Sequence, residues 1–470
     1  MQIERFYLGC LAHASYLVHD GGEAAVIDPQ RDVDIYVARA AELGVRVRWV
    51  VETHLHADFV SGHLELARRT GAEVCLGTGS SAAFPHRDLD EGQCLPLGAG
   101  FLRTLSTPGH TEESICIVAH PTADADPLAV FTGDTLFIGD VGRPDLSPSR
   151  SPQELAGVLY DSLHEKLLKL PDATIVYPAH GAGSLCGRNM SSDTSSTIGR
   201  ECAHNYALQT ESREQFVELL TAELPARPAY FADDVARNRE GAAPLEELPP
   251  LRSLSPAEVR ELQRAGAVVL DTRPVIEFAV AHVPGSIHIA LNGQFASWAA
   301  RIFGSGDQGV DVPVLLLADG LVADEDAVLR ETRLRLSRVG IDHTIGALEG
   351  GIHSWLRAGF ETSYIAQITP VELAEWLEQP PEKTVIVDVR EPAEHASGSI
   401  PGAISIPLGQ LRTRLDEIER GPMVFVHCKG GYRSSIASSV LQSSGFPKVA
   451  NVTGGYDAWK LTVPAHTGGN

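Results

Sequence analysis

The sequence predicts an α/β protein of three domains, the last two of which are copies of one unit. Its 470 residues correspond to about three domains at roughly 150 residues each. Short β-type runs alternate with helical patterns along the chain, and a long segment of the second half recurs once. With 43% hydrophobic residues, the chain can build several separate cores.

Net charge and hydropathy limit the partners that we expect. The chain carries 38 Lys+Arg against 61 Asp+Glu, a formal charge of 38 − 61 = −23, and shows no basic block. Such an acidic surface repels phosphate backbones and anionic lipids, so we expect neither nucleic acid nor a membrane as a partner. The longest apolar run, at residues 314–318, is far shorter than the about 20 residues that span a bilayer. Residues 1–6 show no pattern of a secretory signal.

The seven cysteines indicate a reducing compartment. They are odd in number and are not spaced as disulfide or zinc pairs, so we expect a cytoplasmic protein with mostly buried thiols. Cys186 and Cys202 are each expected to be small buried residues, with a role near the site left open.

The first domain is expected to alternate strands with helices. Strands at 24–28 and 46–52 flank a helix at about 33–43, and a Ser- and Thr-rich loop is expected at 189–199. Residues 212–215 form a capping box that starts a helix. Residues 241–256, with four prolines, are predicted to be a linker. Further strands are expected at 101–106, 114–118, 128–132 and 174–177.

Beyond the linker the chain repeats itself. Residues 268–291 match residues 385–408, and residues 348–359 match residues 452–463, in pattern and length. Each copy alternates short strands and helices, so each should form a parallel sheet covered by helices. The predicted domains span 1–245, 250–360 and 365–470.

Polar side chains gather where predicted strands end in the first domain. His54, His56 and Asp58 follow directly after the strand at 46–52. Loops at the ends of strands converge at one edge of a sheet, which is where sites are built. Imidazole and carboxylate groups collected in this way suit a first-row transition metal. Three further candidates stand in the same context, namely His110, Asp134 and His180.

This pattern resembles the metallo-β-lactamase superfamily over about residues 1–240, which implies an αββα sandwich. Binuclear members of that superfamily carry His-x-His-x-Asp-His, whereas here Phe59, which has no lone pair to donate, occupies the last position. The resemblance to the persulfide dioxygenase branch therefore implies a single ferrous ion, Fe(II), per chain. The ligands that it implies are His54, His110 and Asp134, with open positions left for dioxygen and a thiolate sulfur.

Other residues of these motifs are expected to surround the metal. His56, Asp58 and His180 would orient the ligands or face the substrate through hydrogen bonds, and direct ligation by His56 is left open. Arg143 and Tyr177 each fit a site role, the Tyr177 hydroxyl as a catalytic group, or a structural role. The stretch after His180 departs from glutathione-using members and resembles bacterial fusions of persulfide dioxygenase with rhodanese.

The last domain contains a cysteine in a loop suited to sulfur chemistry. A strand at 424–427 leads into Cys428, and a helix is expected from about 434 to 442. Backbone N–H groups at a helix start, made accessible by two glycines, stabilise a thiolate, and Arg433 adds positive charge. Such a thiolate is a good nucleophile, and the same loop would hold a persulfide. The loop residues expected to bind the substrate are Lys429, Gly430, Gly431 and Tyr432.

The length of this loop distinguishes two families. Tyrosine phosphatases also place a cysteine and an arginine around a helix start, but their loop is longer. Here four residues separate Cys428 from Arg433, and the shorter loop resembles that of rhodanese, as do residues 388–391 and 454–459.

The middle copy keeps the rhodanese-like framework but lacks the nucleophile. It retains Asp271 and Arg273, yet its strand at 314–318 ends in Asp319 where the cysteine is expected. A carboxylate cannot carry a sulfane sulfur, and residues 320–326 offer no amide ring followed by a suitable arginine. We therefore predict that this copy is catalytically silent.

Together these motifs predict a persulfide dioxygenase fused to one inactive and one active rhodanese domain. The iron site would oxidise a low-molecular-weight persulfide (RSSH) with O2 to sulfite, and Cys428 would pass sulfane sulfur between sulfite and thiosulfate in either direction. The choice between monomer and homo-oligomer is left open. One alternative is a dizinc thioester hydrolase of the glyoxalase II type with an appended sulfurtransferase, which Phe59 opposes. Another is a non-catalytic sulfur-carrier scaffold.

Overall fold

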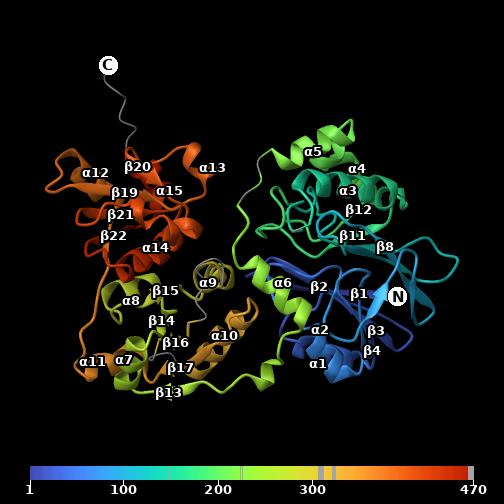
Figure 1. Cartoon of the computed structure of the whole chain (residues 1–470), viewed down its shortest axis with the longest axis horizontal. Helices are drawn as coiled ribbons and strands as arrows, with labels where there is room; N and C mark the ends of the chain where they lie inside the picture. Colours follow the sequence, from blue (N-terminus) through green and yellow to red (C-terminus); the bar gives the residue numbers. More distant parts are fainter. Residues whose placement is uncertain (148, 223, 225, 305–311, 320–323, 464–470) are drawn as a thin grey trace. The chain divides into compact units, whose positions relative to one another are not determined.

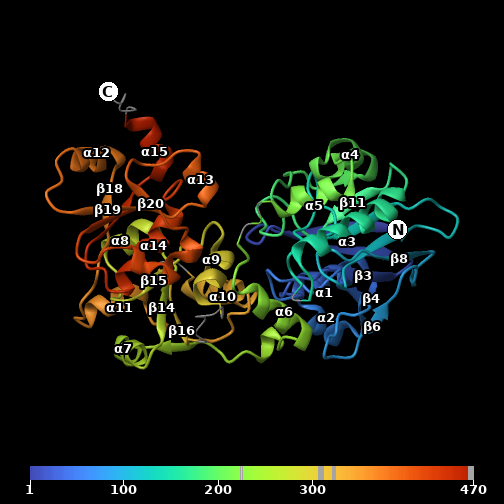
Figure 2. The same ribbon diagram turned by 45° about the horizontal axis from the view of Figure 1, so that its top comes forward.

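The structure is a computed structural model that describes residues 1–147, 149–222, 224, 226–304, 312–319 and 324–463. These residues form two compact units, both drawn in Figure 1 and Figure 2. The first contains Met1–Leu248, and the second contains most of the described chain from Pro249 on. None of the helices in these ranges combines the length and hydrophobicity that a membrane-spanning segment needs.

Two six-stranded sheets form the first unit. The first sheet follows the chain in order, β1-β2-β3-β4-β5-β6, with the bounds Gln2–Leu8, His13–Asp20, Glu23–Ile27, Arg46–Val51, Glu73–Gly77 and Arg87–Leu89. The second sheet has the order β12-β11-β10-β9-β8-β7, with the bounds Ser196–Thr197, Ile175–Pro178, Ala129–Gly133, Ile115–His120, Gly100–Ser106 and Cys94–Leu97.

The alternation of side chains along the strands explains why these sheets stack. In β2, Tyr16 and Val18 point into a core shared with the other sheet, whereas Leu17 points to the outer face. Helices α1 and α2 (Asp34–Leu43 and His63–Thr70) lie against the first sheet, and α3, α4 and α5 (Pro152–Glu165, Ile198–His204 and Arg213–Thr221) lie against the second (Figure 1). The αββα sandwich is confirmed.

Two parallel five-stranded sheets form the second unit. The middle copy runs from β13 to α11 and has the strand order β13-β17-β16-β14-β15, with the bounds Arg252–Leu254, Thr344–Leu348, Val314–Leu317, Val268–Asp271 and Ile287–His288. The last copy runs from β18 to α15 and has the order β18-β22-β21-β19-β20, with the bounds Ala366–Ile368, Val449–Val452, Met423–His427, Thr384–Asp388 and Ala403–Ser405. Every strand pair in both sheets is parallel, which confirms the predicted topology.

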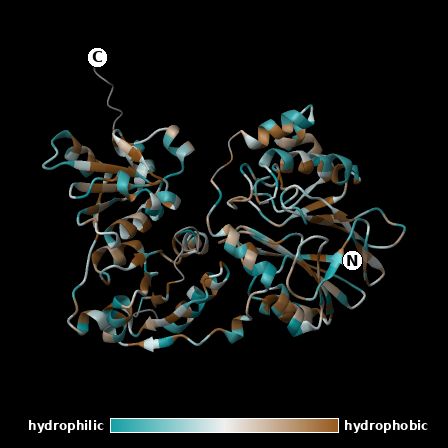
Figure 3. Cartoon of the chain, viewed as in Figure 1, coloured by the Kyte–Doolittle hydropathy of each residue, from teal (hydrophilic) through white to brown (hydrophobic). Residues whose placement is uncertain are grey.

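The helices of the two copies also correspond. Helices α7 and α12 begin alike, with Pro256 and Pro370 at the first position behind capping boxes of Ser255 and Thr369. Hydrophobic residues, brown in Figure 3, line the strands, while the helices mix hydrophobic and hydrophilic residues. The helices of the middle copy are α7 Pro256–Arg264, α8 Val275–Val280, α9 Phe295–Phe303, α10 Glu325–Ser337 and α11 Gly351–Arg357. Those of the last copy are α12 Pro370–Glu378, α13 Pro392–Ala396, α14 Tyr432–Ser443 and α15 Gly455–Thr462.

Two predicted irregular segments contain regular structure. The linker prediction for 241–256 was wrong at Arg252–Leu254, which forms β13 and pairs with β17 almost a hundred residues later. The loop prediction for 189–199 was wrong at its end, because β12 pairs with β11 there and α4 begins at Ile198. In both cases pairing with a distant strand overrides local composition.

The strand register corrects one position in the middle copy. Asp271 pairs with Leu317, and its counterpart Asp388 pairs with His427. The residue after Leu317 therefore corresponds to Cys428, and that residue is Ala318 rather than the predicted Asp319. An alanine methyl group cannot carry sulfur either. Of the predicted silent segment 320–326, residues 320–323 lie outside the described residues.

Candidate functional site

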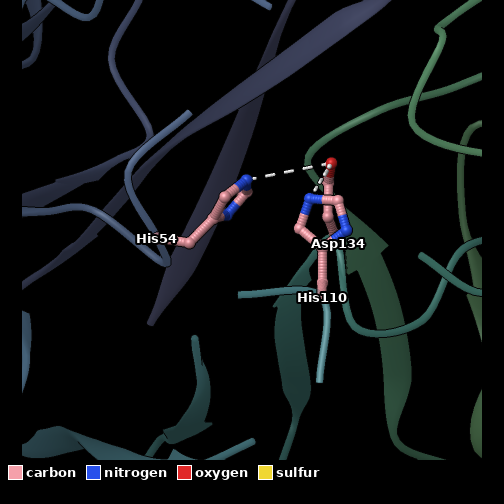
Figure 4. Close-up of side chains that lie close together, drawn as sticks. All are labelled: His54, His110 and Asp134. Carbon is pink, nitrogen blue, oxygen red and sulfur yellow. Dashed lines mark ion pairs between the residues drawn. The ribbon is translucent and has the colours of Figure 1, made fainter. Parts of the chain in front are cut away.

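Three of the predicted metal-binding residues meet at one edge of the sandwich in the first unit. His54 follows β4, His110 lies between β8 and β9, and Asp134 follows β10 (Figure 4). The Nε2 atoms of His54 and His110 lie 3.8 and 3.4 Å from Asp134 Oδ2. All three side chains are buried, and one donor atom from each lies within 4.8 Å of the others.

Hydrogen bonds on the far side of each imidazole fix which nitrogen faces the cluster. His110 Nδ1 lies 3.0 Å from the carbonyl oxygen of Arg143, which can only accept, so Nε2 keeps its lone pair. His54 Nδ1 lies 3.0 Å from Thr53 Oγ1, whose own proton goes to Asp28 Oδ2. The Nε2 lone pair of His54 therefore also faces Asp134.

The electrostatics of this cluster suit a cation. Burial lowers the pKa of both His54 and His110, which keeps them neutral. Burial would raise the pKa of Asp134, but the charge and hydrogen bond of His180, together with His54 and His110, hold it well below its usual range. Within the described residues, His110 Nε2 and Asp134 Oδ2 are buried without a hydrogen-bond partner. Buried nitrogen and oxygen atoms that have lone pairs but no hydrogen-bond partner fit a divalent metal ion with two imidazole ligands and one carboxylate ligand.

His180 lies between two carboxylates rather than among the three converging donors. Its Nδ1 is 2.7 Å from Asp134 Oδ1, and its Nε2 is 3.1 Å from Asp58 Oδ2. Burial alone would lower the pKa of His180, but the charges of Asp134 and Asp58 raise it well above the usual value. With both nitrogens facing carboxylates, His180 orients Asp134 from behind.

The His56 ring lies against that of His54, with centroids 4.1 Å apart, and its Nε2 faces a buried acidic pair. Its Nε2 lies 3.2 Å from Asp28 Oδ1 and 3.4 Å from Glu52 Oε2. Burial would lower its pKa, but hydrogen bonds and charges from Asp28 and Glu52 raise it to about 10. Asp28 holds this position with a φ of 51°, a strained conformation for a residue other than glycine, and strain of this kind is common at functional sites.

An aromatic ring, Phe59, and a second histidine, His13, lie beside His56, and the motifs did not reveal His13. Phe59 is fully buried, and its ring centroid lies 4.4 Å from that of His56 and 4.1 Å from that of His13. Both ring nitrogens of His13 are buried without a hydrogen-bond partner among the described residues. His13 is the first residue of β2 and belongs to no motif, so no spacing pointed to it.

Arg143, Tyr177 and Cys186 lie in different surroundings. Arg143 is buried, its guanidinium binds Asp145 at 2.6 Å, and it faces the site through its carbonyl group. Tyr177 packs on Phe131 in the core between the sheets, so the structure does not bring its hydroxyl into the histidine cluster. Cys186 is buried with its sulfur near Asp134 and His180, whereas Cys202 is exposed, contrary to the prediction. Burial and nearby carboxylates raise the pKa of Cys186 well above its usual value.

A distant asparagine holds the ligand loop in place. Asn238, on α6 (Phe231–Glu240), donates from Nδ2 to the carbonyl oxygens of His56 and Phe59, both at 2.8 Å. Its Oδ1 accepts from the N–H of Ser61 at 2.8 Å. These three buried bonds fix residues 56–61 directly after His54, and sequence reasoning missed them because their partners lie about 180 residues apart.

The second unit brings the predicted thiol loop together. Cys428 directly follows β21 and is buried, and α14 begins at Tyr432, two residues earlier than predicted. Its sulfur accepts hydrogen bonds from the N–H of Gly431 at 3.1 Å and from Ser434 Oγ at 3.4 Å. Gly431 adopts a φ of 107°, which other residues rarely adopt. Ser434 was not predicted.

The charged groups of the loop have different partners. Arg433 forms a bidentate ion pair with Glu394 at 2.6 and 2.8 Å, and Glu394 was not predicted. Lys429 is exposed, and Gly430 borders open space. The Tyr432 hydroxyl donates to the carbonyl oxygen of Ala290 in the middle copy at 2.9 Å. The guanidinium is therefore already neutralised, and Lys429 faces solvent.

A buried ionic group lies beneath the loop. Asp388 accepts from Arg390 Nη2 at 2.6 Å and lies 2.8 Å from His395 Nδ1. Burial lowers the pKa of His427 to about 4, so the residue before the nucleophile is a neutral imidazole. In α15, the N–H of Tyr456 donates to the carbonyl oxygen of Cys428 at 2.7 Å and fixes the start of the loop.

Comparisons with known proteins agree with the folds of the two units. The family model "Metallo-beta-lactamase superfamily" matches residues 8–180, and the model "Rhodanese-like domain" matches residues 255–358 and 369–462. A probable metallo-hydrolase of Burkholderia pseudomallei is 37% identical over 218 residues, which cover 38% of this chain and 72% of that protein. The chain belongs to the metallo-beta-lactamase superfamily. It is an enzyme of this superfamily that carries two rhodanese-like domains in tandem.

Other relatives in this superfamily carry two different names. The mitochondrial persulfide dioxygenase ETHE1 of Bos taurus is 33% identical over 213 residues, covering 44% of this chain and 75% of that protein. A hydroxyacylglutathione hydrolase of Acidiphilium cryptum is 30% identical over 243 residues, covering 51% of this chain and 90% of that protein. The solved structure of a metallo-beta-lactamase from Staphylococcus aureus covers 74% of this chain and 98% of its own, at 27% identity and a TM-score of 0.64.

Proposed function

We propose that the first unit is a persulfide dioxygenase with one ferrous ion held by His54, His110 and Asp134. The observation that carries this proposal is the separation of the histidines. Two face Asp134 with free lone pairs, while His180 is tied between Asp134 and Asp58 and Phe59 offers no donor. Two imidazoles and one carboxylate on one side leave coordination positions open, as in iron oxygenases. The likeness to persulfide dioxygenase relatives supports the same reaction.

The residues around the trio prepare the reaction RSSH + O2 + H2O → RSH + SO3²⁻ + 2 H⁺. A bound ferrous ion supplies the redox chemistry that lets dioxygen react with a persulfide sulfur. Arg143 orients His110 through its carbonyl group, and Thr53 orients His54. His180 holds one oxygen of Asp134, which leaves the other oxygen to face the ion.

We further propose that Cys428 transfers sulfane sulfur. Sulfite attacks the outer sulfur of the Cys428 persulfide, the S–S bond breaks, and the electron pair remains on Cys428 as the thiolate while thiosulfate leaves. The N–H of Gly431 and the hydroxyl of Ser434 stabilise that thiolate. The reverse step would load Cys428 from thiosulfate. Lys429, exposed and next to Cys428 in sequence, suits the anionic substrate.

Removing the nucleophile tests this division of labour. In Cys428→Ser, O2 uptake with a persulfide should remain at the wild-type rate, while conversion of sulfite to thiosulfate should stop. The measurement is O2 uptake with sulfite and thiosulfate quantified on iron-loaded protein, and wild-type protein is the control. Loss of O2 uptake in the variant would contradict the division.

A second candidate function is a dizinc thioester hydrolase, which one observation favours. His56, Asp58 and His180 also offer donor atoms within 4.8 Å of one another, and hydroxyacylglutathione hydrolases are among the relatives. Metal analysis after anaerobic purification separates the two functions, since about one iron per chain supports the oxygenase and two zinc ions support the hydrolase.

We also propose domain boundaries, a cellular location and small-molecule partners for this chain. We place the domains at 1–245, 250–360 and 365–470, with Lys429, Gly430 and Gly431 in the substrate loop. None of the cysteines in the described part of the chain forms a disulfide, which supports a cytoplasmic, reducing location. The proposed partners are a small persulfide, O2, sulfite and thiosulfate.

A further inference from the structure

Helix α14, which begins at the loop of Cys428, is buried on every side. From Ser434 to Leu441 each residue is at most 3% exposed, although half of these residues are serines. A helix that covers a sheet normally keeps one polar face in water, and this one does not. Its inner side packs on β21 and β22 of its own sheet, and another side packs on β15 of the middle copy. The middle copy therefore completes the surroundings of the catalytic helix.

Two serine hydroxyls of α14 contact a single residue of the middle copy. His288, at the end of β15, has its Nδ1 2.8 Å from Ser435 Oγ, and its backbone N–H donates to Ser439 Oγ at 3.0 Å. His288 Nε2 lies 2.9 Å from the carbonyl oxygen of Arg273. Because that oxygen can only accept, Nε2 carries the proton and Nδ1 accepts from Ser435.

The middle copy differs from the last copy at this position. Asp271 pairs with His288, and its counterpart Asp388 pairs with Ser405, so the two residues are equivalent. The His288 ring is stacked on Phe278, with centroids 4.5 Å apart. Burial lowers the pKa of His288, which agrees with a neutral ring that accepts from Ser435. The copy without a nucleophile thus carries a buried, fixed imidazole aimed at the neighbouring catalytic helix.

The same contact continues into the loop that holds the thiol. Ser434, next to Ser435, donates to the sulfur of Cys428, and Gly431, next to Tyr432, donates to the same sulfur. The Tyr432 hydroxyl is bound by Ala290, two residues after His288. Each residue that donates a hydrogen bond to the Cys428 sulfur is therefore next in sequence to a residue that is hydrogen-bonded to the middle copy.

We propose that the middle copy positions the Cys428 loop, with His288 as the positioning residue. By holding Ser435 and Tyr432 it keeps the hydroxyl of Ser434 and the N–H of Gly431 on the Cys428 sulfur. This inference rests on the proposed sulfur transfer for its purpose, but the geometry that it describes concerns the reactivity of the thiol itself.

The test measures alkylation of Cys428 by iodoacetamide in the full-length chain, followed by mass spectrometry of its peptide across a range of pH. Ser435→Ala should slow alkylation at neutral pH about fivefold, which is the size of effect that one hydrogen bond carries, and should move the pH profile of alkylation to higher pH. Tyr432→Phe should act in the same direction. His288→Ala should have a larger effect than either, and His288→Gln, which keeps an acceptor for Ser435, should restore most of the rate.

Ser443→Ala is the matched control, because it makes the same chemical change on the same helix. The Ser443 hydroxyl donates to the carbonyl oxygen of Val440, and the residue is not fully buried. This variant should alkylate at the wild-type rate. Equal rates for Ser435→Ala and Ser443→Ala would overturn the proposal, as would a His288→Gln that is no faster than His288→Ala.

Sulfurtransferase assays on the same proteins separate this inference from the proposed function. If the wild-type chain transfers no sulfur while the alkylation rates still separate Ser435→Ala from Ser443→Ala, the proposed transfer fails and the positioning role stands. If transfer is normal in every variant and alkylation is unchanged, the positioning role fails and the transfer stands.

Discussion

A buried aspartate–arginine pair lies at the same place in both rhodanese-like copies. Arg273 Nη2 donates to Asp271 at 2.6 Å and to the carbonyl oxygen of Ala281 at 2.8 Å. Arg390 Nη2 donates to Asp388 at 2.6 Å and to that of Gly398 at 2.7 Å. This pair joins a strand end to the loop after the following helix, and it is preserved even where the adjacent chemistry is lost.

The chemistry-bearing positions beside this pair differ between the copies. Ala318 stands where Cys428 stands, and Leu317 stands where His427 stands. The framework residues are constrained by folding, because removing either partner leaves a buried charge unpaired. The positions at the strand end would serve only the proposed sulfur transfer, so a copy without that reaction does not need them.

The largest expected effect comes from moving the nucleophile between copies. Cys428→Ser should lower sulfurtransferase turnover by about a hundredfold or more, because no other group in the loop can carry sulfur. Adding Ala318→Cys to that variant should restore no activity, since Asp319 follows where the last copy has Lys429. The measurement is thiosulfate-dependent sulfur transfer. Recovery of activity would show that the two copies differ by the thiol alone.

The second test asks whether both copies depend equally on the shared pair. Asp271→Asn and Asp388→Asn should each lower the free energy of unfolding of their own copy by about 3–5 kcal/mol, because each leaves a buried guanidinium without a countercharge. Pulse proteolysis in urea, with peptides assigned by mass spectrometry, measures this for each copy.

Glu417→Gln serves as the control for these two variants. It breaks the solvent-exposed Arg414–Glu417 pair and should change little. A large loss in only one of the two copies would contradict the view that folding preserves the pair.

The third and smallest expected effect concerns pH. Burial lowers the pKa of His427 to about 4, below the value of about 6.5 for an unfolded histidine. The unfolded chain then binds more protons between these values, so the free energy of unfolding falls as pH falls from about 6.5 to about 4, by at most about 3 kcal/mol. His427→Leu reproduces the residue of the middle copy and should flatten this dependence in the last copy. The same pulse proteolysis at several pH values checks it, and an unchanged slope would contradict it.

Sequence reasoning located the groups that carry a local signature. Polar residues at strand ends indicated six candidates, and the family resemblance singled out His54, His110 and Asp134 among them. The loop of Cys428 came from two glycines before a helix. Each of these short motifs borders a strand or a helix that fixes its local geometry.

Other features depend on long-range contacts and carry no local signature. His13, the first residue of β2, packs against Phe59 outside any motif, and Asn238 binds a loop about 180 residues away. Arg143 contacts His110 through its backbone carbonyl group, which every residue has. The arginine side chain therefore gave no correct indication of this role. The middle-copy residue that corresponds to Cys428 is Ala318 rather than Asp319, and only the pairing of neighbouring strands made this evident.

The three hydrogen bonds of Asn238 have a consequence for synthesis on the ribosome. All three proposed ligands of the metal lie before residue 135, yet the side chain that holds the loop after His54 is added only at residue 238. A nascent chain grows from its N-terminus at about 5–20 residues per second, so several seconds or more pass between synthesis of the proposed ligands and synthesis of Asn238. A fragment ending at residue 180, where the superfamily match ends, contains every proposed ligand but lacks Asn238. We therefore expect tight binding of the proposed metal only after α6 has docked.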